Sequence, residues 1–503
     1  MNGLPNSWQS AKLGDVCEPS QYGYTAKAGS SGNLHFLRTT DITAGHINWD
    51  SVPFCIADDE SSIKYLLHDG DVVISRAGSV GFSCLIRQPR PSVFASYLIR
   101  FRPLINADYF KYFLLTPDYW NAIGERSLGI AVQNVNASRL SEIDIPVAPL
   151  NEQNRIVARL DELLSDLDAG VAELKAAQKK LTRYRQSLLK AAVEGALTAE
   201  WRASHKHTET GVQLLESILT ERRTRWETKQ LAKFAEQGKT PPRDWRQKYL
   251  EPIKPCIADL PELPEGWVWA SIDQLSEFIT SGSRGWADYY SDAGAIFIRS
   301  QNINKDWLDL SDIAFVNPPH SAEGARTLVQ KDDVLLTITG ANVGKAAHVE
   351  DDIVEAYVSQ HVALIRPVNK ALSKVLHLFL TAEAGGRGTL NKYAYGAGKP
   401  GLNLQQIAGV CVPLAGEDEF KVLLDIFNFQ LTEITSKKLA VELAIKKAFA
   451  QRQNILRTAF SGQLLPQDTN DEPASVLLER IYTERVQRDT GKKLRSRKIT
   501  AKA

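Results

Sequence analysis

Residues 151–193 read NEQNRIVARLDELLSDLDAGVAELKAAQKKLTRYRQSLLKAAV, a stretch without proline in which a leucine returns every seventh position. Those leucines are Leu160, Leu167, Leu174, Leu181 and Leu188. A later stretch repeats the pattern with Phe427, Ile434, Val441, Ala448 and Ile455. A seven-residue apolar spacing is typical of a coiled-coil seam. We therefore expect one long coiled-coil helix in each half of the chain, with a long amphipathic helix packed on its own domain as the alternative.

Charge predicts how the two helices pair. Residues 151–172 hold five acidic and two basic side chains, and residues 173–193 hold one and six. Residues 418–439 hold four acidic and three basic side chains, and residues 440–460 hold one and four. An antiparallel pair places each acidic half against a basic half, whereas a parallel pair does not. About 40 residues at about 1.5 Å each would make a bar of roughly 60 Å, with a globular part at each end.

The rest of the chain repeats at a nearly constant offset, which indicates two tandem copies of one unit. The clearest matches are Leu4-Pro5-x-x-Trp8 with Leu263-Pro264-x-x-Trp267, Asp71–Ser75 with Asp333–Thr337, and Asn136–Pro146 with Asn403–Pro413. Gly195 and Gly462 follow the two helices at equivalent places, as helix-ending glycines do.

Short β-type runs between Gly, Asn and Asp dominate the part of each copy that precedes the helix. We expect an α+β fold, in which two tandem mostly-β domains are joined by two long antiparallel coiled-coil helices around a pseudo-twofold axis. The expected segments are 1–150 (first globular domain), 151–200 (central helix), 201–262 (charged helix and linker), 263–415 (second globular domain), 416–465 (distal helix) and 466–503 (short helix and basic tail).

Composition excludes several classes of protein. The chain has 503 residues, a net charge of +1 and five scattered cysteines, which fit a reducing cytoplasm rather than a disulfide framework. No apolar run is long enough for a membrane span, and no secretory signal is visible. The near-neutral charge argues against a nucleic-acid binder, unless the positive charge is local or partners supply it.

Several strings resemble catalytic or cofactor motifs and fail in context. Asn317-Pro-Pro-His320 has no glycine-rich cofactor strand before it, and Gly396-x-Gly398-x-x-Gly401 contains Pro400 and lacks a βαβ unit. The string from Gly340 to Lys345 is one residue short of a phosphate loop, and His205-x-His207 lies in a polar linker. We therefore expect no active site, no metal and no cofactor in this chain. The basic tail 485–502 either contacts DNA phosphates or is a solvated end.

Polar loops after the strand-like runs suit base recognition, because Arg, Asn and Gln can make bidentate contacts to bases and glycine lets the backbone approach phosphate. Ordinary turns with the same residues are the alternative. The candidate DNA-binding residues are Arg38, Thr39, Thr40, Ser75, Arg76, Gly78, Ser79, Gln133, Asn134, Asn136, Arg299, Ser300, Asn302, Thr337, Thr339, Asn342, Lys399 and Asn403.

Five strings carry a family resemblance: Leu4-Pro-x-x-Trp8, Arg38-x-x-Asp41-Ile42, Gly70-Asp71-Val72, Ile145-Pro146-x-x-Pro149-Leu150-x-Glu152-Gln153, and 181–197 followed by Thr198-x-x-Trp201-Arg202. With the tandem order, they resemble the specificity subunit of type I restriction–modification enzymes over nearly the whole chain.

The resemblance implies that each globular part is a target-recognition domain reading one half of a bipartite asymmetric DNA site. It also implies helices that fix the spacing and hold two methyltransferase subunits, with restriction subunits joining that core. S-adenosylmethionine, ATP and magnesium would belong to those partners. The second copy departs from the pattern, since Pro413-Leu414-Ala-Gly-Glu417-Asp-Glu419 lacks the Glu-Gln pair. The rival interpretations are a self-contained methyltransferase or nuclease, for which no cofactor fold has room, and a two-headed coiled-coil scaffold that does not read DNA.

Overall fold

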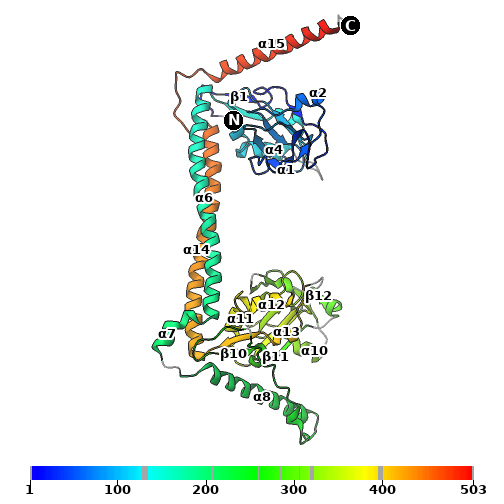
Figure 1. Ribbon diagram of the computed structural model, residues 1–503, viewed down its shortest axis with the longest axis vertical. Helices are drawn as coiled ribbons and strands as arrows, with labels where there is room; N and C mark the ends of the chain where they lie inside the picture. The colour runs from blue at the N-terminus through cyan, green and yellow to red at the C-terminus, as the bar shows by residue number, and fades with distance from the viewer. Residues whose placement is uncertain are drawn as a thin grey trace. The chain divides into compact units, whose positions relative to one another are not determined.

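The computed structural model describes residues 3–126, 134–205, 208–258, 260–282, 285–304, 306–317, 322–394 and 400–500. The chain forms two compact units: unit 1 consists of Met1–Lys175 and Val441–Ala503, and unit 2 of Ala176–Ala440. Each unit therefore contains one globular part, one portion of the central helix and one portion of the distal helix (Figure 1). The segment boundaries expected from sequence remain predictions.

The globular part of unit 1 contains three small sheets among the described residues. An antiparallel sheet has the order β2 (Gln21–Tyr22), β8 (Leu98–Phe101), β5 (Val72–Ser75), β6 (Ser83–Leu85). In a second sheet, β3 (Leu34–Leu37) lies between antiparallel β4 (Phe54–Cys55) and parallel β7 (Ser92–Phe94). β1 (Gln9–Lys12) pairs with β9 (Asp144–Val147). The connecting helices are α1 (Thr39–Ile42), α2 (Asp59–Ser62), η1 (Ile63–Tyr65), α3 (Ala107–Phe113), α4 (Pro117–Arg126) and α5 (Ala137–Ser141).

Unit 2 repeats this plan and adds one strand to its second sheet and a separate two-stranded sheet among the described residues. Its sheets have the orders β11 (Ser276–Ser281), β20 (Val362–Pro367), β17 (Val334–Thr337), β18 (Ala346–His348), and β12 (Tyr290–Ser291), β16 (Ala314–Val316), β13 (Ala295–Ile298), β19 (Ala356–Val358). β10 (Val268–Ser271) pairs with β21 (Cys411–Leu414), and β14 (Ile303–Asn304) with β15 (Trp307–Leu308). The helices are η2 (Ala196–Thr198), η3 (Trp245–Lys248), α9 (Ile272–Leu275), η4 (Trp286–Tyr289), η5 (Ser300–Asn302), α10 (Ala322–Thr327), η6 (Lys370–Leu372), α11 (Ser373–Thr381), α12 (Gly386–Ala394) and α13 (Leu404–Ala408).

Two long helices, α6 (Leu150–Val193) and α14 (Glu417–Phe460), have 44 residues each. In unit 1, Leu160 near the start of α6 shares a core with Leu456 near the end of α14. In unit 2, Leu188 near the end of α6 shares a core with Phe427 near the start of α14. The helices therefore run antiparallel in both units, as the charge pattern predicted (Figure 1).

The predicted seam lies between the helices. Four of its residues are buried and five are half-buried: Leu160, Leu188, Phe427 and Ile434, then Leu167, Leu174, Leu181, Val441 and Ile455. Opposite charges meet beside it, since Arg452 pairs with Asp168.

A glycine ends each helix and packs on the Leu-Pro-x-x-Trp string of its own unit. Gly195 has φ 68° and Gly462 has φ 74°, both in the left-handed region that favours glycine. A Cβ on Gly195 would lie 2.9 Å from Cγ of Pro264, and a Cβ on Gly462 would lie 2.4 Å from Cγ of Pro5. Each unit therefore joins the globular part of one copy to the helix end of the other.

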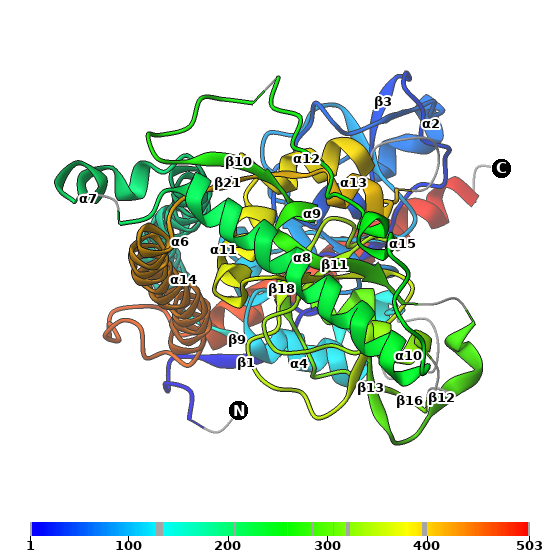
Figure 2. The same cartoon turned by 90° about the horizontal axis from the view of Figure 1, so that it is seen from below.

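Each unit also carries an amphipathic helix after its glycine. In unit 2, α7 (Ala199–Ser204) precedes α8 (Gly211–Glu236), which packs on α9, β10 and β21 through Leu214 and Ile218 (Figure 2). In unit 1, α15 (Ala474–Thr500) buries the equivalent Leu477 and Ile481. The helix α15 is longer than the short helix expected, because it continues to Thr500 through most of the basic tail.

A buried ion pair fixes the register of the central strands in each unit. Asp71, just before β5, accepts from Nε of Arg102, just after β8, at 2.7 Å. Asp333 and Arg366 make the same pair at 2.8 Å in unit 2, with a second bond at 2.7 Å. Burial raises the pKa of Asp333, and the Arg366 guanidinium opposes that rise.

We predict that Arg366→Met lowers the free energy of unfolding by about 3–5 kcal/mol, because it leaves a buried carboxylate unpaired. The deficit should shrink as pH falls, since an unpaired buried carboxylate binds a proton more readily than the unfolded chain does. Urea unfolding at several pH values measures both effects. Lys437→Met, which removes an exposed pair with Glu433, is the control and should cost less than about 1 kcal/mol. Equal losses for the two variants would contradict the role of the buried pair.

Candidate nucleic-acid interface

The first candidate loop follows β3 in unit 1 and β13 in unit 2, and it has the same shape in both. Arg38 precedes α1, and Asp41 accepts from its backbone N at 2.8 Å and from its Nη2 at 2.9 Å. Arg299 precedes η5, and Asn302 Oδ1 accepts from its backbone N at 2.9 Å. The hydrogen bond to Asp41 raises the pKa of Arg38, so this guanidinium stays charged. In unit 2, Arg299 Nη2 donates to Asp312 at 3.3 Å. A carboxylate therefore orients the arginine side chain in each loop.

The second candidate loop follows β5 and β17. In unit 1, the Arg76 guanidinium lies over the Tyr22 ring, 4.9 Å from its centroid, and Gly78 has φ 75°. In unit 2, Gly340 has φ 96°, and the Thr339 hydroxyl is hydrogen-bonded to His361. The glycines allow the left-handed turn that returns the chain towards β6 and β18.

The third candidate segment pairs with the second loop in both units. Val135 N donates to Arg76 O at 3.0 Å, and Leu402 N donates to Ile338 O at 2.8 Å. Asn136 and Asn403 then cap α5 and α13, accepting at 2.8 Å from the backbone N–H of Arg139 and Gln406. Loops that are far apart in sequence are therefore neighbours in each unit, as base recognition would require.

Side-chain contacts also connect the first and second loops in unit 2. Asn342 Nδ2 donates to Ser300 O at 3.1 Å, and Lys345 Nζ donates to Asn342 Oδ1 at 3.0 Å. Beside them is a cavity of about 290 Å³ that combines aromatic and polar walls. Its lining includes Trp286, Tyr290, Arg299, Gln301 and His361.

Three of the candidate residues are buried, so their prediction as surface contacts is not supported. Ser75 and Thr337 are fully buried at the ends of their strands, and Asn302 is 3% exposed. Asn302 Nδ2 donates to Asp309 O and Asp312 O, which shapes the loop around it. Sequence could not separate these shaping residues from exposed ones, because both kinds are small and polar.

The structure leaves the other candidates at or near the surface. Thr40, Gly78, Asn134, Asn136 and Asn403 are exposed, and Arg38, Thr39, Arg76, Ser79, Arg299, Ser300, Thr339 and Asn342 are half-buried. Gln133 and Lys399 lie outside the described residues, as do His207, 318–320 and Gly396 to Gly398 of the rejected motifs.

Arg485 of the basic tail donates to the backbone of Gly14 at 2.8 Å, so the first cation of the tail has a structural contact.

Sequence reasoning missed a further turn beside these loops, which we call the inter-sheet turn. It consists of residues 95–97 after β7 in unit 1 and residues 359–361 after β19 in unit 2. Ala95 N donates to Leu37 O at 2.8 Å, and Arg76 N donates to Tyr97 O at 2.9 Å. The equivalent bonds in unit 2 are 2.9 Å each, from Ser359 N to Ile298 O and from Ile338 N to His361 O. The repeat offset of 264 that aligns Arg102 with Arg366 also aligns Tyr97 with His361. This alignment is the sequence signal that could have identified the two turns as equivalent.

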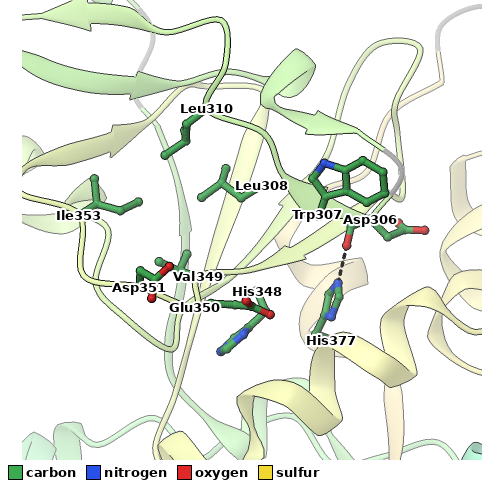
Figure 3. A pocket seen from close by; sticks show the side chains of 10 residues that line it. All are labelled: Asp306, Trp307, Leu308, Leu310, His348, Val349, Glu350, Asp351, Ile353 and His377. Atoms are coloured by element: carbon green, nitrogen blue, oxygen red, sulfur yellow. Dashed lines mark hydrogen bonds between the residues drawn. The ribbon is translucent and has the colours of Figure 1, made fainter. Parts of the chain in front are cut away.

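A second cavity of unit 2, of about 240 Å³, has the wrong charge for a nucleic acid. Asp306, Glu350 and Asp351 contribute carboxylates to its lining (Figure 3). His377 Nε2 lies 2.9 Å from the Asp306 backbone oxygen, and burial lowers the pKa of both His377 and His348. The histidines therefore add no positive charge near neutral pH, and among the three carboxylates Arg387 pairs with that of Asp306.

The described part of the chain has neither a candidate metal site nor a candidate membrane span. No group of three or more His, Cys, Asp or Glu side chains there is placed to hold a metal ion. No helix within the same residues is both long and apolar enough to cross a bilayer.

Comparison with known proteins shows what the chain is similar to. The model of the type I restriction modification DNA specificity domain matches residues 5–176. The chain is 27% identical to the specificity subunit of the type I restriction enzyme EcoBI of Escherichia coli over 391 residues, covering 76% of this chain and 72% of that protein. Residues 5–176 therefore resemble a type I DNA specificity domain, and most of the chain is similar to a specificity subunit of a type I restriction enzyme.

Two further matches agree with this family. The StySPI specificity subunit of Salmonella potsdam is 29% identical over 213 residues, which cover 40% of this chain and 46% of that protein. A solved structure that concerns complex assembly and conformational transition of the type I R-M system has a TM-score of 0.64 and 15% identity, and covers 92% of this chain and 100% of that one. At that identity, the structural likeness shows the fold alone.

The structure explains how the start of the second long helix departs from the Glu-Gln pattern of the first. Glu152 is buried and accepts from Trp8 Nε1 at 2.9 Å and from Gln467 Nε2 at 2.7 Å. Glu419 occupies the equivalent buried position at offset 267, where Thr198 donates to it at 2.7 Å. The glutamate is therefore kept in both copies with different partners, and the residue lost from the Glu-Gln pair is the glutamine.

We predict that Asn342→Ala loosens the first candidate loop without unfolding unit 2, because the lost bond to Ser300 O is the one that joins the two loops. A net loss of about 0.5–1.5 kcal/mol corresponds to roughly 2- to 12-fold faster amide exchange in that loop. Hydrogen-exchange mass spectrometry of the peptides covering 299–304 measures this, with exposed Asn304→Ala as the control. Unchanged exchange in Asn342→Ala would show that the loops are not coupled through this side chain.

Proposed function

We propose that this chain is the DNA sequence-recognition subunit of a type I restriction–modification complex. Each globular part reads one half of a bipartite, asymmetric site. The two long helices fix the spacing between the half-sites and dock two methyltransferase subunits. The family supports DNA recognition in general, and the division of labour between the two units is the proposal made here.

The observation that carries the proposal is one loop framework that presents different side chains in each unit. The backbone bonds that place the second loop, the third segment and the inter-sheet turn occur at equivalent positions in both units. On that shared framework, Thr39 corresponds to Ser300, and half-buried Arg76 corresponds to the buried Ile338, so that only unit 1 has a cation at this position. Base contacts specify sequence, whereas phosphate contacts position the protein. Two copies that differ at the loop surface and agree beneath it are suited to two different half-sites.

The proposal also accounts for the charge balance. The chain has 60 basic and 59 acidic residues, so it carries almost no net positive charge. DNA affinity, however, depends strongly on neutralising the phosphates with positive charge. Methyltransferase subunits would contribute much of the phosphate-binding surface. This subunit would then supply local cations such as Arg38 and Arg299, together with hydrogen-bonding groups for the bases.

We propose further that the chain catalyses no reaction by itself and acts in the cytoplasm. Catalysis would belong to the methyltransferase subunits, which use S-adenosylmethionine, and to restriction subunits that use ATP and magnesium. The second candidate function, a coiled-coil scaffold with two heads that does not read DNA, is disfavoured by the family and by the convergence of arginine- and asparagine-bearing loops in each unit.

Exchanging residues 9–140 for those of a related specificity subunit tests the division of labour. In the assembled complex, this exchange should change one half of the methylated sequence and leave the other half and the spacer unchanged. The reason is that every predicted base contact of the first half-site lies within the exchanged segment. Methylation mapping of genomic DNA reads out both halves, and exchange of 268–412 is the reciprocal control. A change in both halves, or in neither, would contradict independent reading by the two units.

A further inference from the structure

Backbone hydrogen bonds hold the inter-sheet turn at equivalent places in both units, and the last side chain of the turn is exposed. Leu98 N donates to Ala95 O at 2.8 Å and Val362 N to Ser359 O at 3.0 Å, which closes the same four-residue turn in each unit. Ala95 and Ser359 are buried, whereas Tyr97 is 61% exposed and His361 is exposed. The backbone is therefore held whichever side chain occupies the last position.

The anchors place this turn between the two predicted loops. One bond ties the turn to the residue before Arg38 or Arg299, and the other ties it to the start of the second loop. In unit 2, His361 also contacts the second loop through Thr339 and lines the same cavity as Arg299 and Gln301. A side chain here is adjacent to the groups proposed to meet DNA on either side.

The chemistry of the two side chains suits base edges in different ways. The imidazole of His361 can donate and accept hydrogen bonds, and Gln360 Nε2 lies 3.2 Å from its Nε2. Tyr97 offers a hydroxyl that can donate or accept and an apolar ring that can contact a thymine methyl group. An exposed tyrosine on a rigid turn also loses little conformational freedom when it binds.

We infer that Tyr97 and His361 are specificity-determining residues, each contacting the base edges of the half-site read by its own unit. This inference rests on the proposed function. It adds one residue in each unit to the base contacts predicted from sequence. A purely structural role is disfavoured, because the backbone bonds that hold the turn do not involve the Tyr97 or His361 side chain, although His361 also bonds to Thr339. The change from a phenol to an imidazole at one framework position would help the two units to prefer different sequences.

The experiment uses the full chain assembled with its methyltransferase subunits, after methylation mapping has defined the site of the unaltered complex. Binding is measured by competition against duplexes that each carry one base-pair change. Tyr97→Ala should lose about 10-fold or more of the discrimination at one base pair of the first half-site and none in the second. His361→Ala should do the converse. Tyr97→Phe separates the hydroxyl from the ring, and Tyr482→Ala, at an exposed tyrosine of α15, is the matched control.

Unfolding midpoints equal to that of the unaltered chain would show that the variants are folded, as the backbone anchoring requires. Unchanged discrimination at every base pair in folded variants would overturn the inference while leaving the proposed function standing. A uniform loss of affinity across all duplexes would also overturn it, since that is the behaviour of a phosphate contact. If the unaltered complex itself showed no sequence preference, the proposed function would fail instead.

Discussion

The buried aspartate–arginine pair between β5 and β8, and its counterpart between β17 and β20, is the constraint on which the loop framework depends. Asp71 is fully buried and Asp333 is 1% exposed, so each strand pair is held in one register by a bidentate contact that water cannot replace. A slip of one residue would bury an unpaired charge and reverse the faces of both strands. The second loop and the inter-sheet turn lie at the other ends of these same strands, and their positions follow from this register.

A fixed framework under variable loops lets one fold serve two different targets. The anchoring contacts of the loops are mostly backbone hydrogen bonds, which do not depend on side-chain identity. Substitutions at positions such as Tyr97 or Arg76 can then alter chemistry at the surface without altering the strands beneath. The helix-ending glycines add a second level of constraint, because each unit closes the globular part of one copy against the helix end of the other.

The repeat, the antiparallel helices and the seam were predictable because long-range periodicity and charge order survive in the sequence even where most residues differ. The site was less predictable. Asn302 and Ser300 look alike in sequence, yet the first is buried with its amide bonded to backbone oxygens and the second is half-buried at the loop surface. The inter-sheet turn was missed because Tyr97 begins a strand-like run, and only the fold shows that this run starts beside Arg76. The family resemblance implied recognition domains but no particular contacts, which depend on side-chain burial.

We propose that α6 and α14 set the distance between the half-sites that the two units read. Inserting one heptad at matching positions of both helices keeps the apolar seam in phase and lengthens the pair by about 10 Å, or roughly three base pairs at about 3.4 Å each. Methylation mapping of the assembled complex should then return unchanged half-sites with a longer spacer. If the added rotation about the duplex cannot be accommodated, binding should be lost instead. The original spacer, methylated at normal efficiency, would contradict the account.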